Sequence, residues 1–85
     1  MEKTVKELEQ LAHLLKNSND EKAIREAIQS LRDRVGAIHE LPLRNELDHE
    51  LEIWQSKLAV ILEEPVGRQG MAKHAEYWIE KLKNV

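Results

Sequence analysis

Apolar residues recur at intervals of three and four through most of the chain, and charged residues fill the positions between them. This spacing places apolar side chains on one face of an α-helix, whereas a half-buried strand would alternate them. Turn-forming residues interrupt the pattern near positions 17–20, 41–42 and 64–70. The pattern therefore predicts four amphipathic helices, at about residues 5–16, 21–40, 43–63 and 71–83.

Local signals support two of these boundaries. Thr4 followed by Glu7 has the spacing of a capping box, which predicts that the first helix starts near Val5. Pro42 disfavours helical backbone at Leu41 and suits the first turn of the next helix. We therefore expect the second and third helices to form a tight antiparallel hairpin.

Residues 64–70 carry a proline and two glycines just before the last predicted helix. This composition is typical of a connection, so we expect a flexible loop here. Gly67 and Gly70 flank Arg68 and Gln69 next to a helix start, which leaves an anion-binding nest of backbone amides as the alternative.

Each helix contributes one apolar stripe to the predicted core. On the third helix Ile53 and Val60 fall outside the stripe, on the same row as Glu46, so the apolar arc is wide. We expect this helix to be the most buried and to touch more than one neighbour. Tyr77 also lies off its stripe. The predicted core residues are Leu8, Leu11, Leu15, Ile24, Ile28, Leu31, Val35, Leu47, Leu51, Trp54, Leu58, Ile61, Trp78 and Leu82.

The fold class follows from these elements: an all-α protein, a small four-helix bundle in one helical domain over residues 1–85. We expect short first and last helices around a long central antiparallel hairpin. A chain of 85 residues without cysteine has neither disulfides nor thiolate metal sites to stabilise it. Dimerisation, with the central helices of two chains sharing a core, is therefore a plausible way to complete the bundle.

Composition narrows the function classes. The net charge is −3 and the aromatic fraction 4%, so we expect no nucleic-acid partner, because such modules usually carry a basic surplus or stacking aromatics. The longest apolar run, Leu58–Leu62, is far too short to cross a membrane. No signal peptide is recognisable in the charged segment Met1–Lys6. We expect a cytoplasmic protein without a cofactor.

Charge is distributed unevenly among the predicted helices. Acidic residues outnumber basic ones across residues 44–64, whereas residues 65–85 carry a basic surplus. This difference suggests that the third and fourth helices pack as neighbours, or that each faces a complementary partner. Two solvated helix faces without special meaning are the simpler interpretation.

The string from Arg44-Asn45 to His49 has the Arg-Asn-x-x-x-His spacing and resembles the active-site motif of the HEPN ribonucleases, which are helical and usually dimeric. The resemblance covers six residues. It implies that Arg44 would hold the phosphate and that His49 would transfer a proton. An exposed, charged first turn of a helix is the alternative.

Glu46 and His49 also form a Glu-x-x-His pair, the spacing with which one helix presents two metal ligands. Bundles that hold two iron ions use this pair twice, and this chain has one copy. We expect no bound metal. We expect histidines such as His13 to face solvent or an interface. Further ligands for a metal ion, beyond Glu46 and His49, would have to come from a second subunit or from His39, Glu40, His74 and Glu76.

These observations favour a non-catalytic helical protein that acts through protein–protein contact, as an adaptor, an inhibitor or a regulatory factor. The contact would use Ile53, Val60 and Tyr77, with Glu46 and His49 at its rim. Its partner would be another protein, a second copy in a homodimer, or both. An enzyme of the HEPN type and a metal-binding bundle are the alternatives.

Overall fold

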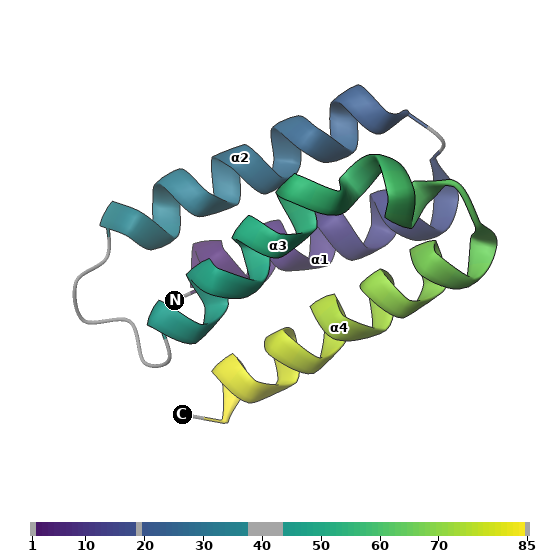
Figure 1. Ribbon diagram of the computed structural model, residues 1–85. Helices are drawn as coiled ribbons and strands as arrows, with labels where there is room; N and C mark the ends of the chain where they lie inside the picture. The colour runs from purple at the N-terminus through teal and green to yellow at the C-terminus, as the bar shows by residue number, and fades with distance from the viewer. Residues whose placement is uncertain (1, 19, 38–43, 85) are drawn as a thin grey trace.

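The computed structural model describes residues 2–18, 20–37 and 44–84. Within these ranges the chain forms four α-helices, and each runs antiparallel to the next along the chain (Figure 1). The predicted all-α four-helix bundle is thereby confirmed. The helices are α1 Glu2–Asn17, α2 Glu21–Ala37, α3 Arg44–Leu62 and α4 Pro65–Lys83.

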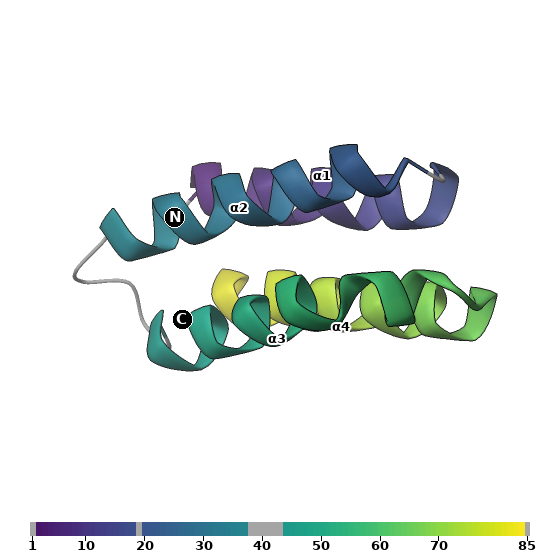
Figure 2. The ribbon, with the colours of Figure 1, turned by 45° about the horizontal axis from the view of Figure 1, so that its top comes forward.

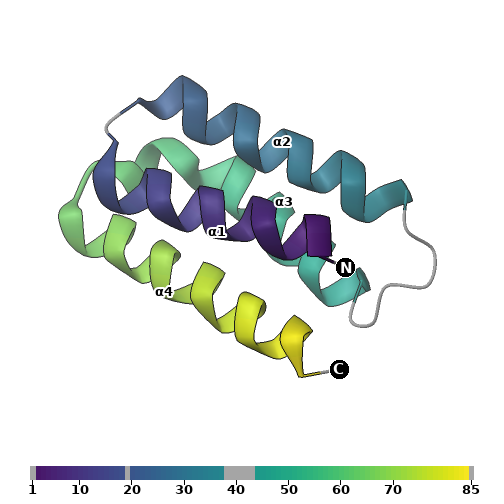
Figure 3. The same ribbon diagram turned by 180° about the vertical axis from the view of Figure 1, so that it is seen from behind.

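The helices are arranged in two layers, α1 with α2 and α3 with α4 (Figure 2). Each helix contacts one partner in its own layer and one in the other, so α1 and α3 both touch α2 and α4. The view from behind shows α1 and α4 side by side across the layers (Figure 3). The molecule therefore has two outer faces, one per layer, and two lateral faces where the layers meet.

The core lies between the two layers. All but one of the predicted core residues are buried, and the exception, Ile61, is partly buried and packs against the core. Each helix contributes through residues three or four apart, as its amphipathic pattern predicts. Buried residues outside the predicted core set are Thr4, Val5, Ala12, Met71, Ala72 and Ala75.

The predicted loop before the last helix is wrong. Helix α4 begins at Pro65, so Gly67 and Gly70 lie inside its first turns and form no anion-binding nest. Proline suits this position because its fixed φ is helical and the first turn needs no amide donor. Gly67 is required by space: a Cβ there would stand 2.3 Å from the backbone oxygen of Ile61. The glycine therefore permits a very short connection between α3 and α4.

The predicted start of the first helix is also wrong. Helix α1 begins at Glu2, and Thr4 is a buried residue within it, four residues before Leu8 on the same face. A side chain that faces the core is not the N-cap of its helix. A side-chain cap does occur at α2, where Asp20 Oδ1 accepts a hydrogen bond of 3.2 Å from the amide of Ala23.

Helices α2 and α3 pack side by side and antiparallel, as expected. The expectation of short first and last helices is wrong, because α1 has 16 residues and α4 has 19, against 17 for α2 and 19 for α3. Helix α3 touches two neighbours as predicted, but it is not the most buried. It has four buried residues, whereas α1 has six. Ile53 and Val60 of its apolar arc are exposed, and Ile61 and Leu62 are partly buried. Residues 38–43, with the expected break at Pro42 and the end of the second predicted helix, lie outside the described residues.

Two arginines cap the C-terminal ends of neighbouring helices. Arg44 donates hydrogen bonds of 3.1 Å to the carbonyl oxygens of Val35 and Gly36 at the end of α2. Arg68 donates to the carbonyl oxygens of Leu15, at 2.9 Å, and Ser18 at the end of α1. The last carbonyls of a helix have no intrahelical donor and carry its negative dipole end. These guanidinium groups therefore join the start of each C-terminal helix to the end of an N-terminal one.

Arg68→Met is expected to lower the free energy of unfolding by about 1–3 kcal/mol, because it removes charged donors from carbonyls in a partly buried site. Lys6→Met, on the exposed side of α1, is the matched control, with an expected change within about 0.5 kcal/mol. Urea unfolding followed by circular dichroism measures both. Equal effects of the two substitutions would show that Arg68 does not cap α1 in solution.

Candidate functional site

The clearest surface feature is the outer side of the α3–α4 layer. The large apolar side chains that are exposed in the described part of the chain are Ile53, Val60, Val66 and Tyr77. Two belong to α3 and two to α4, and none belongs to α1 or α2. The exposed large apolar side chains of the described residues are therefore confined to one layer of the bundle.

The helical periodicity shows which way the α3 side chains point. Ile53 lies two residues from buried Leu51 and from Gln55, which bonds to α2. Two residues correspond to about 200° of rotation, so Ile53 points away from both the core and α2. Val60 has the same relation to Leu58, which is buried. Both side chains therefore project from the outer side of α3.

The same argument applies to α4. Tyr77 lies two residues after buried Ala75 and two before Ile79, which lines the side facing α1. Tyr77 therefore points away from the core and from α1. We call this surface the α3–α4 outer face. It consists of Glu46, His49, Ile53, Ser56 and Val60 on α3 and of Val66, Gly70, Lys73, Tyr77 and Lys81 on α4.

The exposure of these side chains is substantial. Tyr77 is 53% exposed, Val60 70%, Val66 76% and Ile53 37%. Among the described residues, no flanking helix of the same chain buries Ile53, Val60 or Tyr77. The sequence analysis missed Val66, because a residue in a presumed loop has no helical face to assign.

Tyr77 is held in place by its neighbour on the next turn of α4. Lys81 Nζ lies 2.8 Å from the Tyr77 hydroxyl oxygen and 5.2 Å from the centre of its ring. The Trp78 ring meets the Tyr77 ring edge to face, with centres 5.7 Å apart. An aromatic side chain fixed in this way loses little rotamer freedom when a partner covers it.

The acidic residues of α3 are largely engaged within the bundle. Arg32 on α2 lies 3.5 Å from Asp48 and 3.9 Å from Glu52, and it donates a hydrogen bond of 2.7 Å to Gln55. Gln55 in turn donates to Gln29, also at 2.7 Å. This network covers the lateral face between α2 and α3. It stabilises the contact between the two helices and presents no separate site.

The expected neighbour relation of α3 and α4 is confirmed. Across their contact His74 Nδ1 lies 3.0 Å from a Glu50 carboxylate oxygen. This contact joins α3 to α4, whereas Asp48 and Glu52 of α3 pair with Arg32 of α2 instead. Glu46 on α3 and Lys73 on α4 are both exposed beside the apolar residues.

The structure does not bring the HEPN-like residues together. Arg44 is half-buried and binds the carbonyls at the end of α2, whereas His49 is exposed on the α3–α4 outer face. A separation of five residues on one helix rotates them by about 140°. The guanidinium that would hold a phosphate in the HEPN interpretation is thus directed at the backbone.

The candidate metal ligands are dispersed. Glu46 and His49 are exposed on α3, and His74 pairs with Glu50 rather than with Glu76. Among the described residues no three histidine or carboxylate side chains are placed to hold one metal ion. His39 and Glu40 lie outside the described residues.

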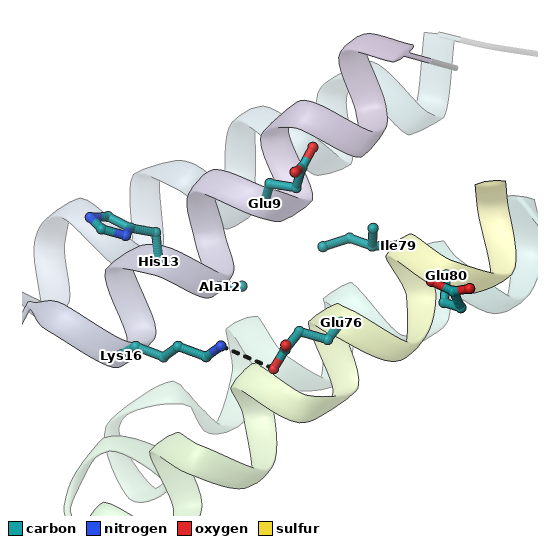
Figure 4. A pocket seen from close by; sticks show the side chains of 7 residues that line it. All are labelled: Glu9, Ala12, His13, Lys16, Glu76, Ile79 and Glu80. Atoms are coloured by element: carbon teal, nitrogen blue, oxygen red, sulfur yellow. Dashed lines mark ion pairs between the residues drawn. The ribbon is translucent and has the colours of Figure 1, made fainter.

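A second feature is a groove of about 370 Å³ on the lateral face between α1 and α4 (Figure 4). Ala12 and Ile79 line its middle, and Lys16 Nζ bridges it by an ion pair of 3.2 Å with Glu76. Carboxylates of Glu9 and Glu80 lie along its edges. The groove can seat one apolar side chain with basic neighbours. It is open and shallow, and the Lys16–Glu76 pair crosses it.

His13 stands at the end of this groove. Its Nδ1 lies 3.2 Å from the side-chain nitrogen of Asn17, which also donates to the His13 carbonyl oxygen. His13 thus takes part in the hydrogen bonds of the last turn of α1.

None of the described helices is long and apolar enough to span a membrane. Comparisons of the chain with protein-family models, with curated proteins and with solved structures give no match.

Proposed function

We propose that this chain is a non-catalytic helical protein that acts by binding a protein partner through the α3–α4 outer face. The observation that carries the proposal is the placement of Ile53, Val60, Val66 and Tyr77, which all project from one layer. Isolated exposed apolar residues are ordinary on a protein surface, but here the large ones among the described residues all lie on one layer, which favours a contact site.

The chemistry of the face supports contact rather than catalysis. Its apolar members are three aliphatic side chains and one tyrosine, and its polar members Glu46, His49, Lys73 and Lys81 lie among them. Burying one such side chain in an interface contributes about 1.5–3 kcal/mol before the costs of association. Tyrosine is also enriched among the residues that dominate binding energies. A helix or helical pair laid across the face would cover all four apolar residues.

Ile53→Asp with Val60→Asp is expected to abolish association while leaving the helical content unchanged, because both side chains lie outside the core. The matched control is Ser30→Asp with Glu26→Asp, on the exposed side of α2. Association is measured by light scattering and by capture of partners with the immobilised protein. Helical content is measured by circular dichroism. Undiminished association in the α3 double variant would refute the proposal.

A further inference from the structure

The charge and shape of the α3–α4 outer face indicate which partner it fits. We infer that the occupant is a second copy of this chain, placed face to face about a two-fold axis parallel to the helices. The inference rests on the proposed function, since it uses the same face. The inference goes beyond the proposed function by naming the partner and by predicting which residues of the two copies meet.

The register between α3 and α4 is the first step. The contact of 3.0 Å between Glu50 and His74 places these residues at one level along the bundle. The two helices are antiparallel and each rises about 1.5 Å per residue. A residue a given number of positions after Glu50 on α3 therefore lies level with the residue the same number of positions before His74 on α4. Tyr77 is level with Leu47, Gly70 with Trp54, and Val66 with Leu58.

The symmetry is the second step. A two-fold axis parallel to the helices, lying between the two faces, preserves the level of every residue and places α3 of one copy opposite α4 of the other. Each contact then occurs twice, as in any isologous interface. The pairs that meet are therefore fixed by the register within a single chain, without any adjustable sliding of one copy past the other.

The apolar pairs match in this arrangement. Val60 of one copy meets Val66 of the other, because both lie within two residues of Leu58 in level. Ile53 meets the stretch around Gly70, where a Cβ would find nothing within 4 Å. A protruding isoleucine thus faces a position that carries no side chain. This arrangement covers the exposed side chains of Ile53, Val60 and Val66 together.

The charged pairs match as well. Lys81 Nζ lies at the Tyr77 hydroxyl. Tyr77 itself is one residue in level from Glu46. Glu46 of one copy therefore faces the ammonium group and tyrosine of the other, and the same pair forms again across the axis. Glu46, the one acidic residue that α3 contributes to this face, thus meets Lys81 of α4 in both halves of the interface. Such complementarity selects this orientation over one that sets α3 against α3, where Glu46 would gain no cation.

Charge reversal tests the pairing. Mass is measured by light scattering over a hundredfold range of protein concentration, and the wild-type chain is expected to dimerise. Glu46→Lys alone and Lys81→Glu alone are each expected to raise the dimer dissociation constant about tenfold, because each places like charges together twice. The double variant restores opposite charges and is expected to return close to the wild-type constant. Additive weakening in the double variant would overturn the pairing.

Gly70→Gln separates association from folding. A Cβ at this helix position meets nothing within 4 Å, so a glutamine favours the helix of the single chain, and its side chain occupies the place where Ile53 of the second copy fits. We expect unchanged helical content and a dissociation constant at least about tenfold higher. The control is Gly36→Gln near the end of α2, where a Cβ also meets nothing, with no expected change in association. Equal dissociation constants for the Gly70 and Gly36 variants would overturn the arrangement.

The two proposals fail differently. A wild-type chain that stays monomeric over the whole concentration range overturns the second copy as occupant. In that case capture of another protein that Ile53→Asp with Val60→Asp abolishes would still uphold the proposed function. A dimer that this double variant leaves intact also overturns the second copy as occupant, and capture of partners that the double variant leaves undiminished overturns the proposed function.

Discussion

Leu51→Ala is expected to lower the free energy of unfolding by about 2–5 kcal/mol, the cost of removing a large aliphatic group from a packed core. Leu51 is fully buried among the side chains that join the two layers of the bundle. A bundle of this size has only a small margin of stability, so a loss of this magnitude leaves much of the chain unfolded at room temperature. Urea unfolding at low protein concentration measures the effect.

Ile53→Ala is the matched control for that substitution, two residues along the same helix. The Ile53 side chain projects from the outer face, so its truncation leaves no cavity in the core. We expect a loss below about 1 kcal/mol, because surface substitutions rarely exceed that value. Comparable losses for Leu51→Ala and Ile53→Ala would contradict the assignment of Ile53 to the α3–α4 outer face.

Gly67→Ala is expected to destabilise the bundle by about 1–3 kcal/mol, the usual cost of forcing an extra carbon into a packed position. The added Cβ would lie 2.3 Å from the Ile61 backbone oxygen, and a backbone atom moves only with its helix. The start of α4 would therefore shift away from the end of α3. Heat or urea unfolding of the isolated chain measures the effect.

Gly70→Ala provides the opposite sign on the same helix. Its Cβ meets nothing within 4 Å, and alanine favours the helix over glycine by about 1 kcal/mol. We expect the free energy of unfolding to rise by about that amount. If both alanine variants were stabilising, the close approach of α4 to Ile61 would be absent in solution.

The periodicity of the sequence predicts the helices and the core well, because burial of an amphipathic face depends mainly on local spacing. Leu47, Leu51, Trp54 and Leu58 recur at helical intervals, and all four are buried. The failure at residues 64–70 has a physical cause. Two glycines usually mark a loop, but here one of them, Gly67, serves a close approach to α3 that no local pattern reveals.

The failure at Thr4 has a different cause. A threonine three residues before a glutamate matches a capping box, yet the same residue also continues the apolar face of α1. Burial of that face extends the helix beyond the presumed cap. Tertiary packing thus overrides a local signal worth about 1 kcal/mol.

The candidate surface is only partly accessible to sequence reasoning. Off-stripe positions such as Ile53, Val60 and Tyr77 can be recognised from the helical wheel, but which helix covers them depends on the order of helices in space. That order places α4 beside α3 and leaves their common outer side open. Arg44 likewise resembles a catalytic residue until its neighbours, the last carbonyls of α2, are known.

The most direct test of the central claim, that the α3–α4 outer face contacts a protein, is site-specific photocrosslinking. A diazirine-bearing residue is placed at position 53 on α3 or, as the control, at position 30 on the exposed side of α2. The account predicts a protein adduct from position 53 and none from position 30, and mass spectrometry identifies it as a second copy or as another protein. Absence of an adduct from position 53, or equal adducts from both positions, would contradict the account.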